Sequence, residues 1–261
     1  MKRNSSIVKF FAVKTFLIFS APAFSQSFYV SGSVGQNYQD DTFNNGTFTS
    51  AFTTGAVTGV TPPLNIPAGS PVSWNTDYDN SNAFNLAVGM SRDNYRFELE
   101  YSQTEADVDR HQGVTAAGID LSAIDAGVLI SGNVDDLGVS TAALVAAGQG
   151  ELEATTLMLN AFYDYKTDSA FTPYVGVGIG TATTDLEFSP SGVGVISDDD
   201  NTFVYQLIIG ASYAFTDNLG AFASYVYRDA DETSLDASLL PARFEIINES
   251  SLLNIGLKFS F

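Results

Sequence analysis

The most constraining feature of this sequence is a strict alternation of apolar and polar side chains, clearest from Tyr95 to Tyr101. One face of this segment carries only Tyr, Phe and Leu. The other carries Arg96, Glu98 and Glu100. Side chains of a strand alternate with period 2, whereas a helix would scatter these charges around its axis. The segment is therefore predicted to be a β-strand with one apolar and one charged face.

The same alternation recurs in seven further segments of roughly ten residues. The last segment ends the chain with an apolar face that includes Phe259 and Phe261. In the segment near residue 177, glycines occupy the face opposite the valines, which suits the close backbones of a narrow barrel. The seven segments are Phe28 to Gln36, Ala83 to Ser91, Leu157 to Tyr165, Tyr174 to Thr181, Phe203 to Phe215, Leu219 to Arg228 and Leu253 to Phe261.

The connections between these eight segments alternate in length. Three are short, at 92–94, 166–172 and 216–218, and four are long, at 38–82, 107–150, 189–201 and 229–248. Short periplasmic turns and long extracellular loops are typical of transmembrane β-barrels, which close because lipid offers no hydrogen-bond partners to a free edge. The pattern predicts an eight-stranded antiparallel up-and-down barrel with both termini periplasmic. A soluble β-sandwich or lipocalin-like barrel is the alternative, with its apolar face inward.

Composition agrees with a membrane barrel and excludes several other classes. Only 16% of the residues are charged and the net charge is −19, which excludes a basic nucleic-acid footprint. The absence of Cys excludes a disulfide framework and a Cys nucleophile. The basic start, the apolar stretch from Phe10 to Phe19 and the small residues before Gln26 indicate a signal peptide over 1–25. The mature domain is then 26–261.

Several segments resemble a known family. The stretches Leu157 to Tyr165 and Phe171 to Gly180 resemble the opacity-protein and surface-antigen family of small outer-membrane β-barrels, of the eight-stranded OmpA type. Asp217 to Tyr227 is similar to the seventh strand of that family. The end from Leu257 to Phe261 resembles its sorting signal for the outer-membrane assembly machinery. The resemblance implies a Gram-negative outer-membrane location and exposed loops, but no single activity.

The charged faces of the predicted strands are expected to meet inside the barrel. A narrow barrel is filled by side chains, and charges buried there must be paired. One interpretation is therefore an internal plug of ion pairs, and the other is a narrow porin-like channel for small solutes. The predicted lumen cluster comprises Arg96, Glu98, Glu100, Asp164, Arg228 and Lys258.

Acidic residues concentrate in the long connections and permit two interpretations. Clustered carboxylates favour hard divalent cations, but no calcium-loop signature is present. A solvated acidic surface is the alternative, and no cofactor is indicated. The weak metal candidates are Asp198, Asp199, Asp200, Asp229, Asp231 and Glu232.

The single histidine bears on enzymatic chemistry. His111 falls in the second long connection, beside no obvious nucleophile, and is predicted to be a solvated loop residue. A Ser-His-acid mechanism needs a histidine next to its nucleophile. Barrel lipid A deacylases pair His and Ser on one strand, a pair that this sequence lacks. A lipid-modifying barrel enzyme is therefore the least favoured of the three functions considered.

The two longest connections differ in character. Prolines at 62, 63, 67 and 71 predict an irregular, mobile first loop. The second loop is unusually apolar, and is expected either to pack over the barrel mouth as a short helix or hairpin or to present a surface for a partner. The leading hypothesis is a non-enzymatic barrel, embedded in outer-membrane lipid, whose acidic loops serve a structural, adhesive or surface-antigen role toward an extracellular ligand.

Overall fold

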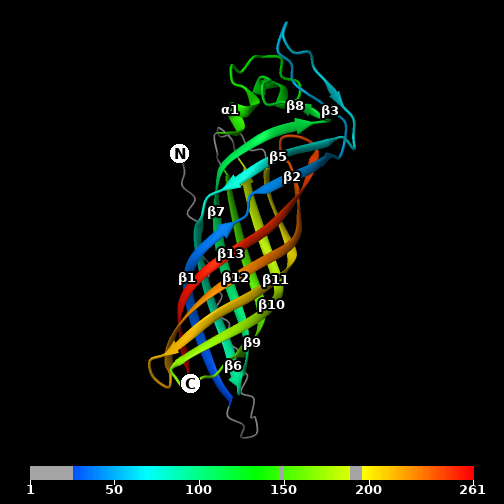
Figure 1. Ribbon diagram of the computed structural model, residues 1–261. Helices are drawn as coiled ribbons and strands as arrows, with labels where there is room; N and C mark the ends of the chain where they lie inside the picture. The colour runs from blue at the N-terminus through cyan, green and yellow to red at the C-terminus, as the bar shows by residue number, and fades with distance from the viewer. Residues whose placement is uncertain (1–25, 147–149, 189–195) are drawn as a thin grey trace, which may run out of the picture.

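The computed structural model describes residues 26–146, 150–188 and 196–261, so the predicted signal peptide (1–25) lies outside the described residues. Eight long antiparallel strands form a closed ring (Figure 1), which confirms the predicted fold class. The ring closes where β1 pairs with β13, from Tyr29 opposite Ser260 to Gln39 opposite Ser250. In chain order the ring strands are β1 (Gln26–Gln39), β6 (Ser81–Arg92), β7 (Tyr95–Ala116), β9 (Gly150–Asp164), β10 (Phe171–Phe188), β11 (Ile196–Ala214), β12 (Leu219–Asp236) and β13 (Ala242–Ser260).

The apolar face of each ring strand points outward. Leu159 is 63% exposed and Ile255 is 67% exposed, although both are aliphatic side chains in the middle of long strands. Such a continuous apolar band is unsuited to water and suits lipid. Inward glycines admit the side chains of neighbouring strands, since a Cβ at Gly178 would collide with the Asn160 amide.

Two strands continue the barrel wall where β1 and β6 stop. The segment β2 (Thr42–Phe48) pairs with β13 beyond the end of β1, and β5 (Pro71–Tyr78) pairs with β7 beyond the end of β6. Because β2 also pairs with β5, the wall stays closed. The prediction of an irregular first loop was therefore wrong for Thr42–Phe48 and Pro71–Tyr78. Residues 49–70, between these two strands, have little regular structure apart from the short pair β3 (Phe52–Thr53) and β4 (Asn65–Ile66).

Other predicted loops are also shorter than expected. Strand β7 continues to Ala116, β12 to Asp236, and β13 begins at Ala242. The predicted loops at 107–150 and 229–248 are therefore partly strand. The predicted loop at 189–201 is strand from Ile196 onward, and its residues 189–195 lie outside the described residues.

The alternation of apolar and polar side chains inverts in this upper part of the wall. On β7, Glu105 and Asp107 point outward, whereas Ala106 and Val108 are buried. On β13, Phe244 is buried between exposed neighbours in the same way. The upper wall thus has the apolar interior of a soluble barrel, while the lower wall has the apolar exterior of a membrane barrel.

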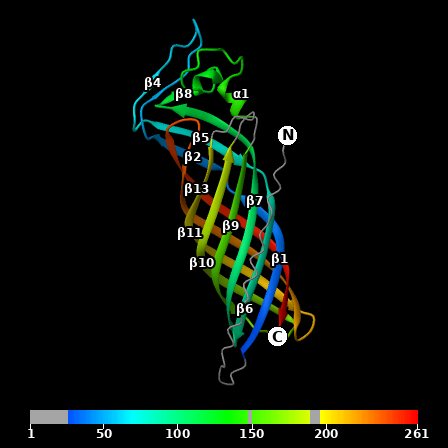
Figure 2. The ribbon, with the colours of Figure 1, turned by 180° about the vertical axis from the view of Figure 1, so that it is seen from behind.

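The second long connection folds over the upper mouth. It contains β8 (Ile119–Asp120), the 3₁₀-helix η1 (Ala126–Leu129) and the helix α1 (Thr141–Val145). This outcome is one of the two alternatives predicted for it, and Figure 2 shows α1 at the end opposite the C-terminus. We call residues 42–78, 108–146 and 235–246 the head. Among the described residues, no helix is long and apolar enough to cross a membrane.

Candidate functional site

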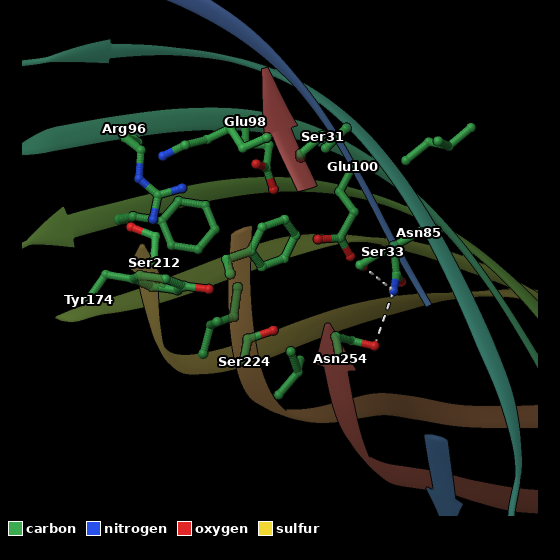
Figure 3. Close-up of a pocket in the computed structure, with 17 residues that line it drawn as sticks. Ser31, Ser33, Asn85, Arg96, Glu98, Glu100, Tyr174, Ser212, Ser224 and Asn254 are labelled. Carbon is green, nitrogen blue, oxygen red and sulfur yellow. Dashed lines mark hydrogen bonds between the residues drawn. The ribbon is translucent and has the colours of Figure 1, made fainter. Parts of the chain in front are cut away.

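The lower part of the lumen is occupied by Arg96 (Figure 3). This side chain of β7 forms a salt bridge with Asp164 of β9 at 2.9 Å. Its guanidinium carbon also lies 4.3 Å from the ring centre of Phe162 and 4.7 Å from that of Tyr174. The carboxylate and the two aromatic faces offset the desolvation cost of burying this guanidinium.

A second ion pair lies farther up the lumen. Arg228 of β12 approaches Glu100 of β7 at 3.2 Å. Arg228 also donates hydrogen bonds to the Gln206 side-chain oxygen at 2.9 and 3.1 Å and to Ser102 at 3.1 Å. These partners lie on two strands, β7 and β11, so the guanidinium of β12 connects opposite walls of the barrel.

The remaining two residues of the predicted lumen cluster, Glu98 and Lys258, both lie beside Tyr29. Glu98 accepts a hydrogen bond from the Tyr29 hydroxyl at 2.9 Å and one from Asn160 at 3.4 Å. The Lys258 ammonium lies 5.5 Å from the Tyr29 ring centre. All six predicted residues therefore lie in the lumen, and the cavity that Arg96, Glu98, Glu100 and Lys258 help to line measures only about 50 Å³.

Sequence reasoning missed the uncharged members of this network. Tyr29, Phe162 and Tyr174 are each buried within the lumen and contact Arg96. Asn160 links Glu98, Glu100 and Gln206 through its amide. Each side chain occupies an inward position of its strand. The period-2 pattern could therefore have identified them as lumen residues.

The candidate metal ligands are not brought together. Asp198 accepts a hydrogen bond from the backbone N–H of Asp236, and Asp200 accepts one from that of Ser234. Asp229 accepts one from the Tyr205 hydroxyl. Asp199, Asp231 and Glu232 lie on the same strands, β11 and β12. In the part of the chain that the structure describes, no three His, Cys, Asp or Glu side chains are placed to hold a metal ion.

His111 is not a solvated loop residue, so that prediction was wrong. It lies on β7, pairs with Thr76 of β5 and is only 4% exposed. The Thr76 oxygen accepts hydrogen bonds from Asn44 and Trp74, so its own O–H donates to Nδ1 of His111 at 2.7 Å. Burial lowers the His111 pKa to about 4, and the imidazole is therefore neutral near pH 7.

An apolar core fills the head around the same residues. The Trp74 ring centre lies 4.5 Å from that of Phe244, and the Phe48 and Phe52 rings stack at 5.6 Å. The second loop joins this core through Leu121 and Val145. The first loop is fixed to the second by the backbone bond from Gly55 N to Val128 O, 3.0 Å long. The head is consequently a packed unit rather than a set of free loops.

At the opposite end, the chain terminus completes the ring. Phe261 N donates to Phe28 O at 2.8 Å, and Phe28 N donates to Phe261 O at 3.2 Å. The side chains of Phe259 and Phe261 are 50% and 66% exposed on the apolar outer face. The two residues predicted as an assembly signal therefore lie at the seam between the first and last strands.

Comparison with known proteins assigns this barrel to a family. Residues 64–237 match the family model described as surface antigen. The chain belongs to the surface antigen family. Outer membrane protein PagN of Salmonella typhimurium is 38% identical to it over 92 residues, which cover 33% of this chain and 38% of PagN. The chain thus matches well under half the length of this curated relative.

A solved structure supports the fold of this family member. The outer membrane protein OprG from Pseudomonas aeruginosa superposes with a TM-score of 0.54 at 16% identity, covering 90% of this chain and 95% of OprG. This likeness supports the barrel fold alone. With the family match and PagN, it identifies the chain as a small outer-membrane β-barrel of a Gram-negative bacterium.

Proposed function

We propose that this surface antigen is a non-enzymatic barrel whose head makes adhesive contacts at the cell surface. The observation that carries the proposal is the packed core of the head, in which Trp74, Phe244 and Leu235 are buried. A folded head presents a fixed surface, so binding to it does not have to order a flexible loop first. In this arrangement the head is extracellular and both termini are periplasmic.

The filled lumen favours this role over a narrow channel. The ion pairs of Arg96 and Arg228 cross the interior, and the space among the lumen residues is about 50 Å³. Above them, Met158 and Val204 are fully buried in an apolar layer. We expect purified, refolded protein to give no stable single-channel steps in a planar bilayer. Reproducible steps would support the porin-like alternative instead.

The placement of His111 supports a non-enzymatic role. Its Nδ1 atom is engaged by Thr76, and the imidazole lies edge-on to Trp74 with ring centres 6.3 Å apart. In this environment the histidine stabilises the head core. Lipid hydrolysis by the refolded protein that vanishes in folded His111→Ala would overturn this proposal.

The charge on the outer face suggests the chemistry of a partner. Directly above the apolar band, Glu105, Glu153, Asp185 and Asp199 stand opposite one another on four adjacent strands. Like charges in such cross-strand pairs cost stability. They also create a negative field that attracts cationic surfaces. A basic protein or other polycationic surface is therefore the partner we propose.

Adhesion of whole cells to polylysine-coated and uncoated glass tests this role. Cells that display the triple variant Glu105→Gln, Glu153→Gln, Asp185→Asn should bind the coated surface less than wild type. The matched control removes three carboxylates at the other end, in Asp93→Asn, Asp168→Asn, Asp217→Asn. Equal loss in both variants would contradict a role for these outer carboxylates, which lie on the wall directly below the head. Binding should also weaken with salt, because the Debye length is only about 10 Å at 0.1 M.

The C-terminal strand is proposed to guide insertion. Phe259 and Phe261 lie exposed at the seam between the first and last strands, where the assembly machinery would recognise them. Replacing both with Ser should reduce the amount of barrel in the outer membrane, measured by fractionation of cells. Unchanged levels would argue against this signal.

A further inference from the structure

The head encloses an apolar cavity that the adhesive role does not use. Its volume is about 100 Å³, and none of the described residues that line it is charged. Interiors of folded proteins contain few voids larger than one water molecule. This cavity is therefore larger than ordinary packing in a protein core requires.

The polar groups at the cavity wall are already satisfied. The Thr54 hydroxyl donates to Gly55 O and accepts from Leu64 N, both at 2.9 Å. The Trp74 indole N–H donates to the Thr76 hydroxyl at 3.1 Å. A buried water needs two to four polar partners, so water gains nothing by entering. A dry cavity of this kind favours apolar molecules.

The walls restrict which apolar molecules fit. Aromatic rings of Phe48, Phe52, Trp74 and Phe244 form part of the wall. The remaining wall is lined mainly by aliphatic side chains, which include the small Ala116 and Ala126. An engineered cavity of about 150 Å³ with similar walls binds benzene or xenon. The available space thus corresponds to a single small ring.

We propose that the head cavity binds small neutral aromatic hydrocarbons of the size of benzene or toluene. Binding replaces missing packing contacts of the wall with contacts to the ligand. The cavity is formed by the first loop, β5, β7, the second loop and the β12–β13 turn together. An occupant would consequently contact every segment of the head.

Trp74 provides the measurement, because it is the only tryptophan of the chain and lines the cavity. The full mature chain, refolded into phosphatidylcholine vesicles, is titrated with bromobenzene, whose heavy atom quenches indole fluorescence on contact. We expect saturable quenching that toluene reverses by competition. Quenching that rises linearly without saturation would show partition into the bilayer alone and would overturn the proposal.

Two variants with the same Ala-to-Leu substitution distinguish binding in the cavity from binding at the lipid-facing surface. Ala116→Leu fills the cavity and should weaken bromobenzene binding at least about tenfold, which corresponds to ~1.4 kcal/mol. Ala223→Leu adds the same atoms on the exposed outer face of β12 and should leave the affinity unchanged. Equal affinities in the two variants would also overturn the proposal.

Folding of each variant is checked by the different gel mobilities of boiled and unboiled samples. Should Ala116→Leu fail to fold, Val114→Leu adds a single carbon to the same wall and takes its place. It should weaken binding by a smaller factor. An unchanged affinity in folded Val114→Leu protein would then count against the proposal.

Discussion

The guanidinium of Arg96 lies 2.9 Å from the carboxylate of Asp164, and the two side chains are only 8% and 13% exposed. Arg96 is thereby held between the walls of the barrel at the end where β6 turns into β7. Removing either partner leaves an uncompensated charge in a poorly hydrated space.

Asp164→Asn is therefore expected to lower the free energy of unfolding by about 3–5 kcal/mol. Urea unfolding of the refolded protein in lipid vesicles measures this loss. The control is Arg243→Met, which breaks the pair of Arg243 with Asp236, where both side chains are 58% exposed. Exposed pairs contribute ~0–1 kcal/mol. Similar losses in the two variants would contradict a plug stabilised by its buried ion pair.

Acid should loosen the head through His111. Burial lowers its pKa from 6.5 in the unfolded chain to about 4. The unfolded state therefore binds the proton more tightly, and stability present above pH 6.5 is lost as the pH falls toward 4. Trp74 fluorescence during urea unfolding at several pH values measures the loss. In His111→Asn the dependence across this window should flatten, and an unchanged slope would exclude His111 as its source.

Neighbouring carboxylates at the outer face should make stability depend on pH in the direction opposite to that of His111. A hydrogen bond with the Glu105 carboxyl, partial burial and repulsion from Glu105 and Glu153 raise the Glu151 pKa to about 7. A raised pKa in the folded state gives stability that is present below about pH 4.5 and lost as the pH rises through 7. Glu151→Gln should remove that part of the pH dependence in thermal unfolding. A curve that keeps its full slope between pH 4.5 and 7 would refute the assignment.

The junction between the two long loops depends on Gly55. A Cβ there would collide with the backbone oxygen of Gly127 and meet those of Ile130 and Asn133 at 2.6 and 2.9 Å. Gly55→Ala should separate the loops and make the second loop cleavable by added protease in the folded protein. Gly32→Ala is the control, because its Cβ would lie 3.4 Å from the nearest atom, on Leu86, in ordinary contact. Equal resistance of both variants to protease would contradict this account.

Sequence reasoning predicted the membrane part of the barrel and underestimated its height. Outward Leu, Phe and Tyr side chains indicate contact with lipid. Residues such as Leu99 and Leu257 therefore allow the eight segments to be predicted as membrane-spanning strands. Above the apolar band the outward positions become acidic, as at Glu105 and Glu153, and the apolar side turns inward. A search for apolar outward faces therefore ends where the lipid ends, although the hydrogen-bonded strands continue.

The candidate site was predictable to the same extent. The charges of the lumen cluster follow from strand parity, because any polar residue opposite a lipid-facing one must point inward. The core of the head cannot be predicted from strand parity, because it depends on the pairing of β2 and β5 with strands far away in sequence. His111 and Thr76 are 35 residues apart, and only this pairing makes them neighbours.

The continuous ladder along β13 has a mechanical consequence. Because β13 pairs with β2 at its start and with β1 along the rest of its length, the described residues connect the head to the membrane wall through one strand, without a flexible stalk. A partner that pulls on the head therefore loads many strand hydrogen bonds at once, in shear. Tension at the surface would be transmitted to the embedded barrel as a whole. The attachment of a cell through this head would therefore be stiff and would extend little under load.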